Sequence, residues 1–305
     1  MEEIVSLIFI SMKYLALDLD ANKQDGIGAQ MMRRLFIWSY CQLYDNIKYV
    51  HVPFIQSSHH PGNLELGKKI EEFFNLGQNE LTLDDVDKND ITFLRVCKNG
   101  ENCIPRCFHN NSDMLDGVVS AFREKFFSNT VSPTIPLEID KDKFNVAIHC
   151  RRGDLLRRDG VFKSRAYSDE YYLDAIEYVK STLLPEGKQV QFTMLTEDAY
   201  FLAEDNVEER TRNIIEGIDI FQRFRNIDNL DIKINNNVLE DMWLMFNVDC
   251  IIASRSTFGK IPSLFNDVMV VDAIGKCPFQ KRYWSKIKDP VDVQSLDYYT
   301  HIDFQ

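Results

Sequence analysis

The sequence predicts an α/β protein with a parallel sheet that carries helices on both faces. In the second half, short apolar runs rich in strand-forming residues alternate with segments of helical periodicity. Such alternation is typical of a parallel sheet, because a crossover helix must return the chain to the same end. The length of 305 residues suits one large domain or two of about 150 residues. A hydrophobic content of 45% and a charged content of 27% are ordinary for a soluble globular protein.

The second half carries the clearer alternation. A strand over Phe144–Cys150 precedes a helix that we expect Ser168 to cap, with Asp169 and Glu170 where the helix dipole favours negative charge. This helix should end before Pro185. The expected elements that follow are strands at Val190–Leu195 and Asp231–Ile234, a helix at Val238–Phe246, and strands at Cys250–Ala253 and Met269–Val271.

The first half gives a weaker pattern. The expected elements are a strand at Lys13–Leu19, a loop at Asp25–Gly28, a helix at Ala29–Tyr44 and a strand at Tyr49–Phe54. Residues 56–110 give mixed signals with polar and glycine breaks. Prolines and charges among small residues at Ser128–Lys143 place the domain junction there. The predicted domains are therefore 1–135 and 136–305.

The net charge of -12 restricts the classes of partner. Nucleic-acid binding needs a basic face, so this chain is not expected to bind nucleic acid. Any anion must instead be bound locally by a few aimed groups. The seven cysteines are spread along the chain and do not resemble a disulfide scaffold. The closest cluster, Cys97, Cys103, Cys107 and His109, fits no common zinc spacing, so free thiols are expected and no metal site is predicted.

The amino-terminal segment MEEIVSLIFISMKYLALDLD does not have the features of a signal peptide. Two glutamates stand where a basic flank is usual, and no small-residue cleavage site is clear. Lys13 interrupts the apolar run, which is too short to span a bilayer. The segment is therefore expected to be buried structure, in a protein that is cytoplasmic if the chain is complete. A degenerate signal anchor is the alternative.

Three polar loops follow predicted strands, where parallel sheets usually bind their ligands. They lie at Arg151–Asp154, Thr196–Asp198 and Ser254–Phe258. In the first, the guanidinium groups of Arg151 and Arg152 fit phosphate oxygens through a rigid fork of donors. The alternative for this loop is an exposed turn held by weak salt bridges.

One further loop, and the last of these three, have features of anion sites. The pair Gly26 and Gly28 before a helix allows backbone N–H groups to approach an anion, although the third glycine of a dinucleotide fingerprint is missing. A simple turn is the alternative. Ser256 and Thr257 offer hydroxyl and amide donors at a helix start, where they can also act as ordinary N-caps.

Several of these stretches together resemble the fucosyltransferase superfamily, which comprises the α1,2, α1,6 and protein O-fucosyltransferases. HCRRGD at 149–154 resembles the H-x-R-R-G/T-D motif of these enzymes, and LTED at 195–198 resembles their acidic strand-end motif. Residues 241–258 resemble their last motif, a helix with an early Asp, an apolar strand and Ser-Thr-Phe. GIGAQM at 26–31 resembles the amino-terminal G-G-x-G-N-Q-M loop, with Asp25 and Ala29 as departures. The motifs cover the second half of the chain well, whereas in the first half the resemblance rests on one loop.

This resemblance implies a GT-B-type glycosyltransferase, with two Rossmann-like halves facing a cleft. The first half would face the acceptor, and the second half would hold GDP-fucose without a metal ion. Arg151 would contact the diphosphate and stabilise the leaving group, and Arg152 would brace the loop or contact the donor. The remaining donor-binding residues implied by the motifs are His149, Asp241, Ser256, Thr257, Phe258, Gly26 and Gly28.

An inverting transfer also needs a base for the acceptor hydroxyl. Asp159 is the candidate, because α1,6 enzymes resemble this chain in having an acidic residue five positions after the Asp154 position. Those enzymes have Lys directly after that Asp, whereas this chain has Leu155. Glu197 or an acidic residue of the first half is the alternative base.

Two other functions remain open at the level of the sequence. The same fold could use a different nucleotide sugar, because no residue identifies a fucose pocket. The chain could also be a catalytically silent module that binds a glycan or a protein. For an enzyme, the acceptor could be a glycan or a protein hydroxyl.

Overall fold

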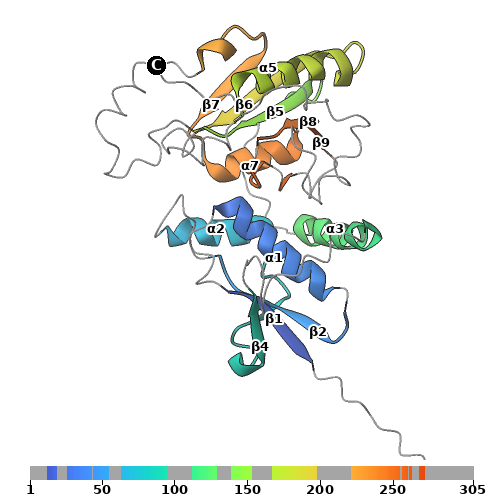
Figure 1. Cartoon of the computed structure of the whole chain (residues 1–305), viewed down its shortest axis with the longest axis vertical. Coiled ribbons are helices and arrows are strands. Elements are labelled where there is room, and N and C mark those ends of the chain that lie inside the picture. Colours follow the sequence, from blue (N-terminus) through green and yellow to red (C-terminus); the bar gives the residue numbers. More distant parts are fainter. Residues whose placement is uncertain are drawn as a thin grey trace, which may run out of the picture. The chain divides into compact units, whose positions relative to one another are not determined.

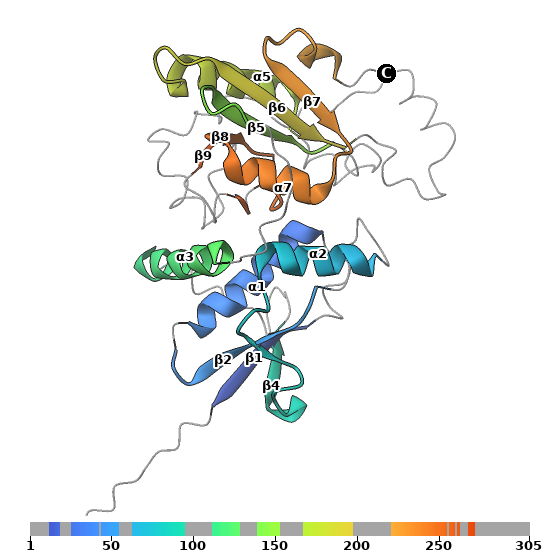
Figure 2. The ribbon, with the colours of Figure 1, turned by 180° about the vertical axis from the view of Figure 1, so that it is seen from behind.

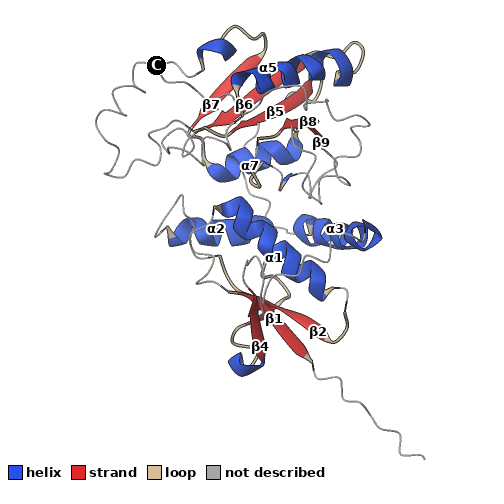
Figure 3. Cartoon of the chain, viewed as in Figure 1, coloured by secondary structure: helices blue, strands red, loops and turns tan. Residues whose placement is uncertain are grey.

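The computed structural model describes residues 12–18, 26–42, 44–54, 63–94, 112–128, 139–152, 167–197, 221–254, 256–259, 261–262 and 268–271. The chain divides into two compact units, Met1–Ser132 and Pro133–Gln305. Each unit contains a parallel sheet with helices (Figures 1 and 3). The predicted α/β class is therefore confirmed.

Unit 1 has a parallel sheet whose described strands pair in the order β3-β2-β1-β4. Its elements are β1 (Lys13–Leu17), α1 (Ile27–Cys41), β2 (Ile47–His51), α2 (Leu64–Phe74), β3 (Leu81–Thr82), η1 (Lys88–Asp90), β4 (Ile91–Leu94) and α3 (Ser112–Phe127). Aromatic rings join the helices. Trp38 of α1 meets Phe122 of α3 at a centroid distance of 5.4 Å, and Phe74 of α2 meets Phe126 of α3 at 6.1 Å. Rings of this size bury much apolar area, so they hold the helices of unit 1 together.

The structure extends the first half beyond the predicted elements. Strand β1 ends at Leu17, and α1 and β2 begin two residues earlier than expected. Helix α2 forms in the segment of mixed signals. The side chain of Asn63 caps it by accepting from the Leu66 amide at 2.9 Å, and Asn75 ends it in the left-handed conformation with φ 55°. These are ordinary helix signals, and Leu66, Ile70, Phe73 and Phe74 between them have helical spacing.

Unit 2 has a parallel sheet with the order β7-β6-β5-β8-β9. Its elements are β5 (Phe144–Cys150), α5 (Asp169–Tyr178), the π-helical turn η4 (Val179–Leu183), β6 (Val190–Thr196), η5 (Gln222–Phe224), β7 (Leu230–Ile234), α7 (Val238–Asn247), β8 (Cys250–Ile252) and β9 (Met269–Val271). The first strand, β5, is central, and the chain builds outward to β7 before it crosses back to β8. The order therefore reverses between β5 and β8, which is the topological switch point of a doubly wound sheet.

The predicted elements of unit 2 are confirmed to within one residue at the ends of each strand and of α7. Helices α5 and α7 lie on opposite faces of the sheet (Figures 1 and 2). On the α5 face, Cys150, Phe192 and Tyr172 belong to one buried cluster. Burying such apolar side chains contributes about 1.5–3 kcal/mol each, so this core accounts for much of the stability of the unit.

One predicted detail of unit 2 is confirmed only in part. Ser168 occupies the N-cap position of α5 with extended backbone, but its side chain makes no capping hydrogen bond. Asp169 and Glu170 lie in the first turn, as expected, and their charge is favourable there. Asp169 also accepts a hydrogen bond from Arg152, which ties the start of α5 to the segment after β5.

Candidate functional site

The carboxyl ends of β5 and β8 lie side by side in unit 2. The two strands pair in parallel from Val146 with Cys250 to Ile148 with Ile252. The segments that leave them, beginning at Arg151 and Ala253, therefore emerge at the same edge of the sheet. This edge is the switch point at which doubly wound folds bind nucleotides and other ligands.

His149 joins these two segments directly. Its Nδ1 lies 2.7 Å from Oγ of Ser254, a residue 105 positions away in the sequence. Its ring also faces the ring of Phe258 at a centroid distance of 5.5 Å. Burial lowers the pKa of the His149 imidazole to about 3, and the positive charge of Arg151 adds to the effect. His149 is therefore neutral near pH 7, which leaves it one ring donor and one ring acceptor.

The two consecutive arginines have different surroundings. Arg152 is 2% exposed and donates to the carbonyl oxygen of Tyr167 at 2.7 Å and to Asp169. Its guanidinium also lies over the ring of Tyr172, 5.6 Å from the centroid. Arg151 is only half-buried, and its charge acts on His149. Arg152 is thus built into the protein, and Arg151 is the more accessible of the two at the strand end.

Ser256, Thr257 and Phe258 belong to a turn that follows β8. The Ser256 amide donates to the Ser254 carbonyl at 2.7 Å, and the Phe258 amide donates to Oγ of Ser256 at 3.2 Å. Ser256 is half-buried and Thr257 is exposed. The turn is therefore held by local hydrogen bonds, and Ser256 stabilises it in the manner of a cap.

Asp241 lies in the first turn of α7, beyond the end of β7. The amide of Asn236 donates to its Oδ1 at 2.9 Å. Burial raises the pKa of the Asp241 carboxyl to about 7, and the negative charges of Glu197 and Glu240 add to this, against the opposing effects of Asn236 and Lys233. Since Glu197 directly follows β6, the structure brings the predicted LTED stretch and Asp241 into electrostatic contact.

We expect the Asp241→Asn variant to be about as stable as the wild type near pH 3.5 and more stable above pH 7. The folded-state pKa of Asp241 is raised, so its stabilising contribution is present below the unfolded pKa of about 3.8 and is lost as the pH rises through about 7. Asparagine stays neutral and keeps the oxygen that accepts from Asn236. The gain should be about 1–3 kcal/mol, measured by urea unfolding across this pH range.

The matched control for this prediction is Asp174→Asn, which changes an exposed carboxylate on α5. It should shift stability by only a small amount, because the side chain that it replaces is exposed. If Asp241→Asn follows the control, burial does not govern the titration of Asp241.

Gly26 and Gly28 lie in unit 1, at the start of α1. Gly26 is the N-cap residue, with φ -67° and ψ 163°, and the amides of Ala29 and Gln30 donate to its carbonyl at 3.1 Å. This backbone conformation is open to any residue, so Gly26 is not required by its dihedral angles. The predicted loop before the helix is thus partly wrong, because Gly28 already lies within the first turn.

Some predicted residues lie outside the described residues. These are Asp159, the cluster of Cys97, Cys103, Cys107 and His109, and the tail of the first motif, Gly153 and Asp154. Ser254, Gly259 and Asn236 contact the predicted site residues His149 and Asp241. Ser254 belongs to a polar loop that the sequence predicts at the ligand-binding edge, but the sequence analysis gives none of the three residues an individual role. The glycine after Ser-Thr-Phe is the signal in the sequence that could have pointed to Gly259.

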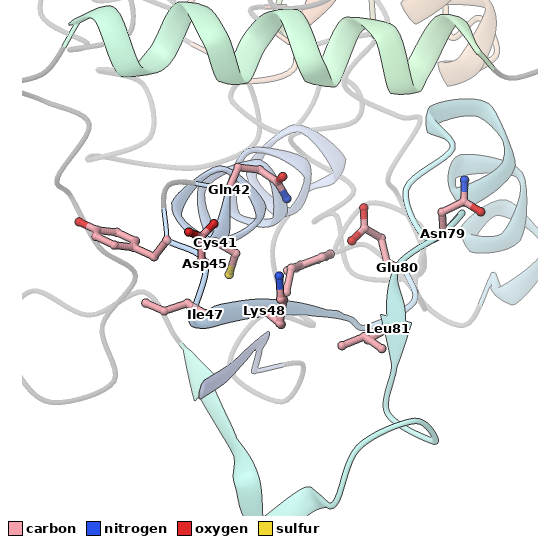
Figure 4. Close-up of a pocket in the computed structure, with 10 residues that line it drawn as sticks. Cys41, Gln42, Asp45, Ile47, Lys48, Asn79, Glu80 and Leu81 are labelled. Carbon is pink, nitrogen blue, oxygen red and sulfur yellow. The ribbon is translucent and has the colours of Figure 1, made fainter. Parts of the chain in front are cut away.

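A cavity of about 240 Å³ lies in unit 1, at the amino ends of β2 and β3 (Figure 4). Glu80 lines it and accepts from Nε1 of Trp38 at 2.8 Å and from Lys125 at 2.5 Å. Burial, with the charge of Glu80, raises the pKa of the Cys41 thiol to about 12, so this thiol is a poor nucleophile. None of the predicted site residues lines this cavity.

Among the residues that the structure describes, no group of three or more His, Cys, Asp or Glu side chains is placed to hold a metal ion. In the same parts of the chain, no helix is both long enough and apolar enough to cross a bilayer.

No protein-family model matches this chain, and neither does any curated protein. Three solved structures of NodZ α-1,6-fucosyltransferase are similar to it. One, co-crystallized with GDP, has 12% identity and a TM-score of 0.36 over 87% of this chain and 97% of that chain. A second, soaked with GDP-fucose, has 12% identity and a TM-score of 0.38 over 86% and 96%. The third, a selenomethionine form from Bradyrhizobium, has 13% identity and a TM-score of 0.34 over 86% and 95%. Similarity at this level of identity and TM-score transfers no function to this chain.

Proposed function

We propose that this protein is a glycosyltransferase that binds GDP-fucose at the carboxyl edge of the unit 2 sheet and transfers fucose with inversion. The observation that carries the proposal is the contact between His149 and Ser254 at the switch point. It brings together two sequence motifs about 100 residues apart, both of which resemble fucosyltransferase motifs. A chance resemblance gives no reason for the two motifs to meet at the edge where this fold binds ligands.

The proposed roles are those that the resemblance implies, and the surroundings of Arg152 decide between its two alternatives. Arg151 binds the diphosphate and offsets the negative charge that grows on GDP as the glycosidic bond breaks. Ser256, Thr257 and Phe258 line the diphosphate site, and Asp241 contacts the nucleoside. Arg152 is fully engaged by Tyr167 and Asp169, so it braces the segment after β5.

The acceptor hydroxyl attacks the anomeric carbon from the side opposite GDP, and a carboxylate takes its proton. Asp159 remains the proposed base, with Glu197 as the alternative. In this proposal an arginine side chain, and not a metal ion, binds the phosphates and offsets their negative charge. Gly26 and Gly28 would contribute at the start of α1, and unit 1 would face a glycan or protein acceptor.

Calorimetric titration with GDP-fucose, GDP-mannose, UDP-glucose and GDP tests the donor, with GDP release in the absence of acceptor as the measure of turnover. We expect GDP and GDP-fucose to bind, slow hydrolysis of GDP-fucose, and no effect of EDTA on either. Binding of another nucleotide sugar in preference would support the same fold with a different donor. A protein that binds none of the four would instead be a silent glycan- or protein-binding module.

A further inference from the structure

We infer that Ser254 and Gly259 are positioning residues of the donor site, which fix the imidazole of His149 and thereby lock the turn after β8 onto the end of β5. This inference rests on the proposed function. It concerns two residues to which no individual role is assigned above, although Ser254 lies within the stretch that resembles the last motif. Neither residue need touch the donor, because both act through the His149 ring.

Gly259 leaves the space that the His149 ring occupies. A Cβ atom at position 259 would lie 2.7 Å from Nδ1, 2.9 Å from Cγ and 3.1 Å from Cβ of His149. Real Cβ atoms do not make contacts below about 3.0 Å, so either the ring or the turn would have to move. In the described part of the chain, Gly187 is the glycine that has a positive φ. Gly259 does not, so a glycine is needed at position 259 for space and not for its dihedral angles.

Ser254 holds the same ring by its polar edge. Its side chain is 1% exposed, and its Oγ lies 2.7 Å from Nδ1 of His149. The ring is thus hydrogen-bonded by Ser254, packed against the backbone at Gly259 and faced by Phe258. These three contacts all come from the segment after β8, whereas His149 belongs to β5. They therefore fix the two segments relative to each other across the switch point.

Such a lock matters because donor groups aimed at a diphosphate are effective only if they are in place before the ligand binds. Arg151 lies two residues after His149, and Ser256 and Thr257 lie between Ser254 and Gly259. A shift of the ring would move the two sets of donors apart. Misplacement of this kind, by about 1 Å, can lower reactivity about 10²-fold.

The test is a double-mutant cycle in which Gly259→Ala is made in the wild type and in the His149→Ala variant. GDP affinity is measured by calorimetry and unfolding by thermal melting. In the wild type, Gly259→Ala should weaken GDP binding about 10-fold or more and lower Tm. Without the ring there is nothing to displace, so in His149→Ala the same substitution should change both quantities very little. Ser254→Ala should weaken GDP binding in the wild type and have no further effect in His149→Ala.

Gly187→Ala is the matched control. Gly187 has φ 77° with nothing near its Cβ position, so alanine strains the backbone and lowers Tm without reaching the site. GDP affinity should be unchanged in this variant, measured well below its Tm. The control separates general destabilisation from a specific effect on the donor site.

Two results would overturn the inference. One is a Gly259→Ala effect of equal size in both backgrounds, which would mean that the substitution does not act through His149. The other is coupling seen in Tm with unchanged GDP affinity, which would make the lock a purely structural contact. A wild-type protein that fails to bind GDP contradicts the proposed function itself, and this result is known before any variant is made.

Discussion

Replacing Arg151 by alanine is expected to lower the rate of GDP release from GDP-fucose by about 10²–10³-fold, while the protein remains folded. In the proposed site the Arg151 guanidinium faces charge that develops as the donor breaks, so the loss falls mainly on kcat. Arg151 is half-buried at the end of β5, and the core of unit 2 does not include it. Turnover and thermal melting of the same preparation measure the two quantities.

Arg151→Lys should not restore turnover, because a single ammonium cannot replace the fork of donors on the diphosphate. The control is Arg223→Ala. Arg223 is a half-exposed arginine on η5 that pairs with Glu170, and its removal should leave turnover unchanged. Near-normal turnover in Arg151→Ala would mean that Arg151 does not act on the diphosphate, and it would contradict the proposed mechanism.

The second large effect is a loss of stability in acid that depends on His149. Burial, aided by Arg151, depresses the folded-state pKa of His149 to about 3, below the usual value of 6.5. Its contribution to stability is therefore present above pH 6.5 and is lost as the pH falls toward 3. A shift of this size corresponds to at most about 5 kcal/mol, since each pKa unit is worth about 1.4 kcal/mol.

His149→Asn keeps a polar group near Ser254 but cannot take up a proton in this range. Urea unfolding between pH 3.5 and pH 7.5 should show a shallower acid loss for this variant than for the wild type. Asp241 titrates with the opposite sign between about pH 4 and pH 7, so the two groups partly cancel in the intact protein. The measurement is therefore best made in the Asp241→Asn background. If the stability of this variant and that of the Asp241→Asn, His149→Asn double variant fall in parallel as the pH is lowered, the prediction is contradicted.

The second half of the chain could be predicted closely because its strands are short apolar runs with clear turn signals between them. Phe144–Cys150 and Met269–Val271 are found as expected. In the first half, β3 has only two residues, and the four residues of β4 do not alternate between buried and exposed. Helix α2 has many charged residues around its buried Ile70, Phe73 and Phe74. Strands as short as β3 and β4 form because their neighbours cover them, which the local pattern does not reveal, whereas the spacing of the buried residues of α2 does indicate a helix.

The sequence by itself determined the alternation of strands and helices and the chemical type of the residues after β5 and β8. Only the tertiary structure decided that β5 and β8 are neighbours, and hence that His149 meets Ser254 across 105 residues. The tertiary structure also decided that Arg152 is buried while the adjacent Arg151 is accessible. It set the pKa values of His149 and Asp241 as well. The physical reason is that local propensity acts over a few residues, whereas strand order, burial and the approach of two side chains depend on how the whole sheet assembles.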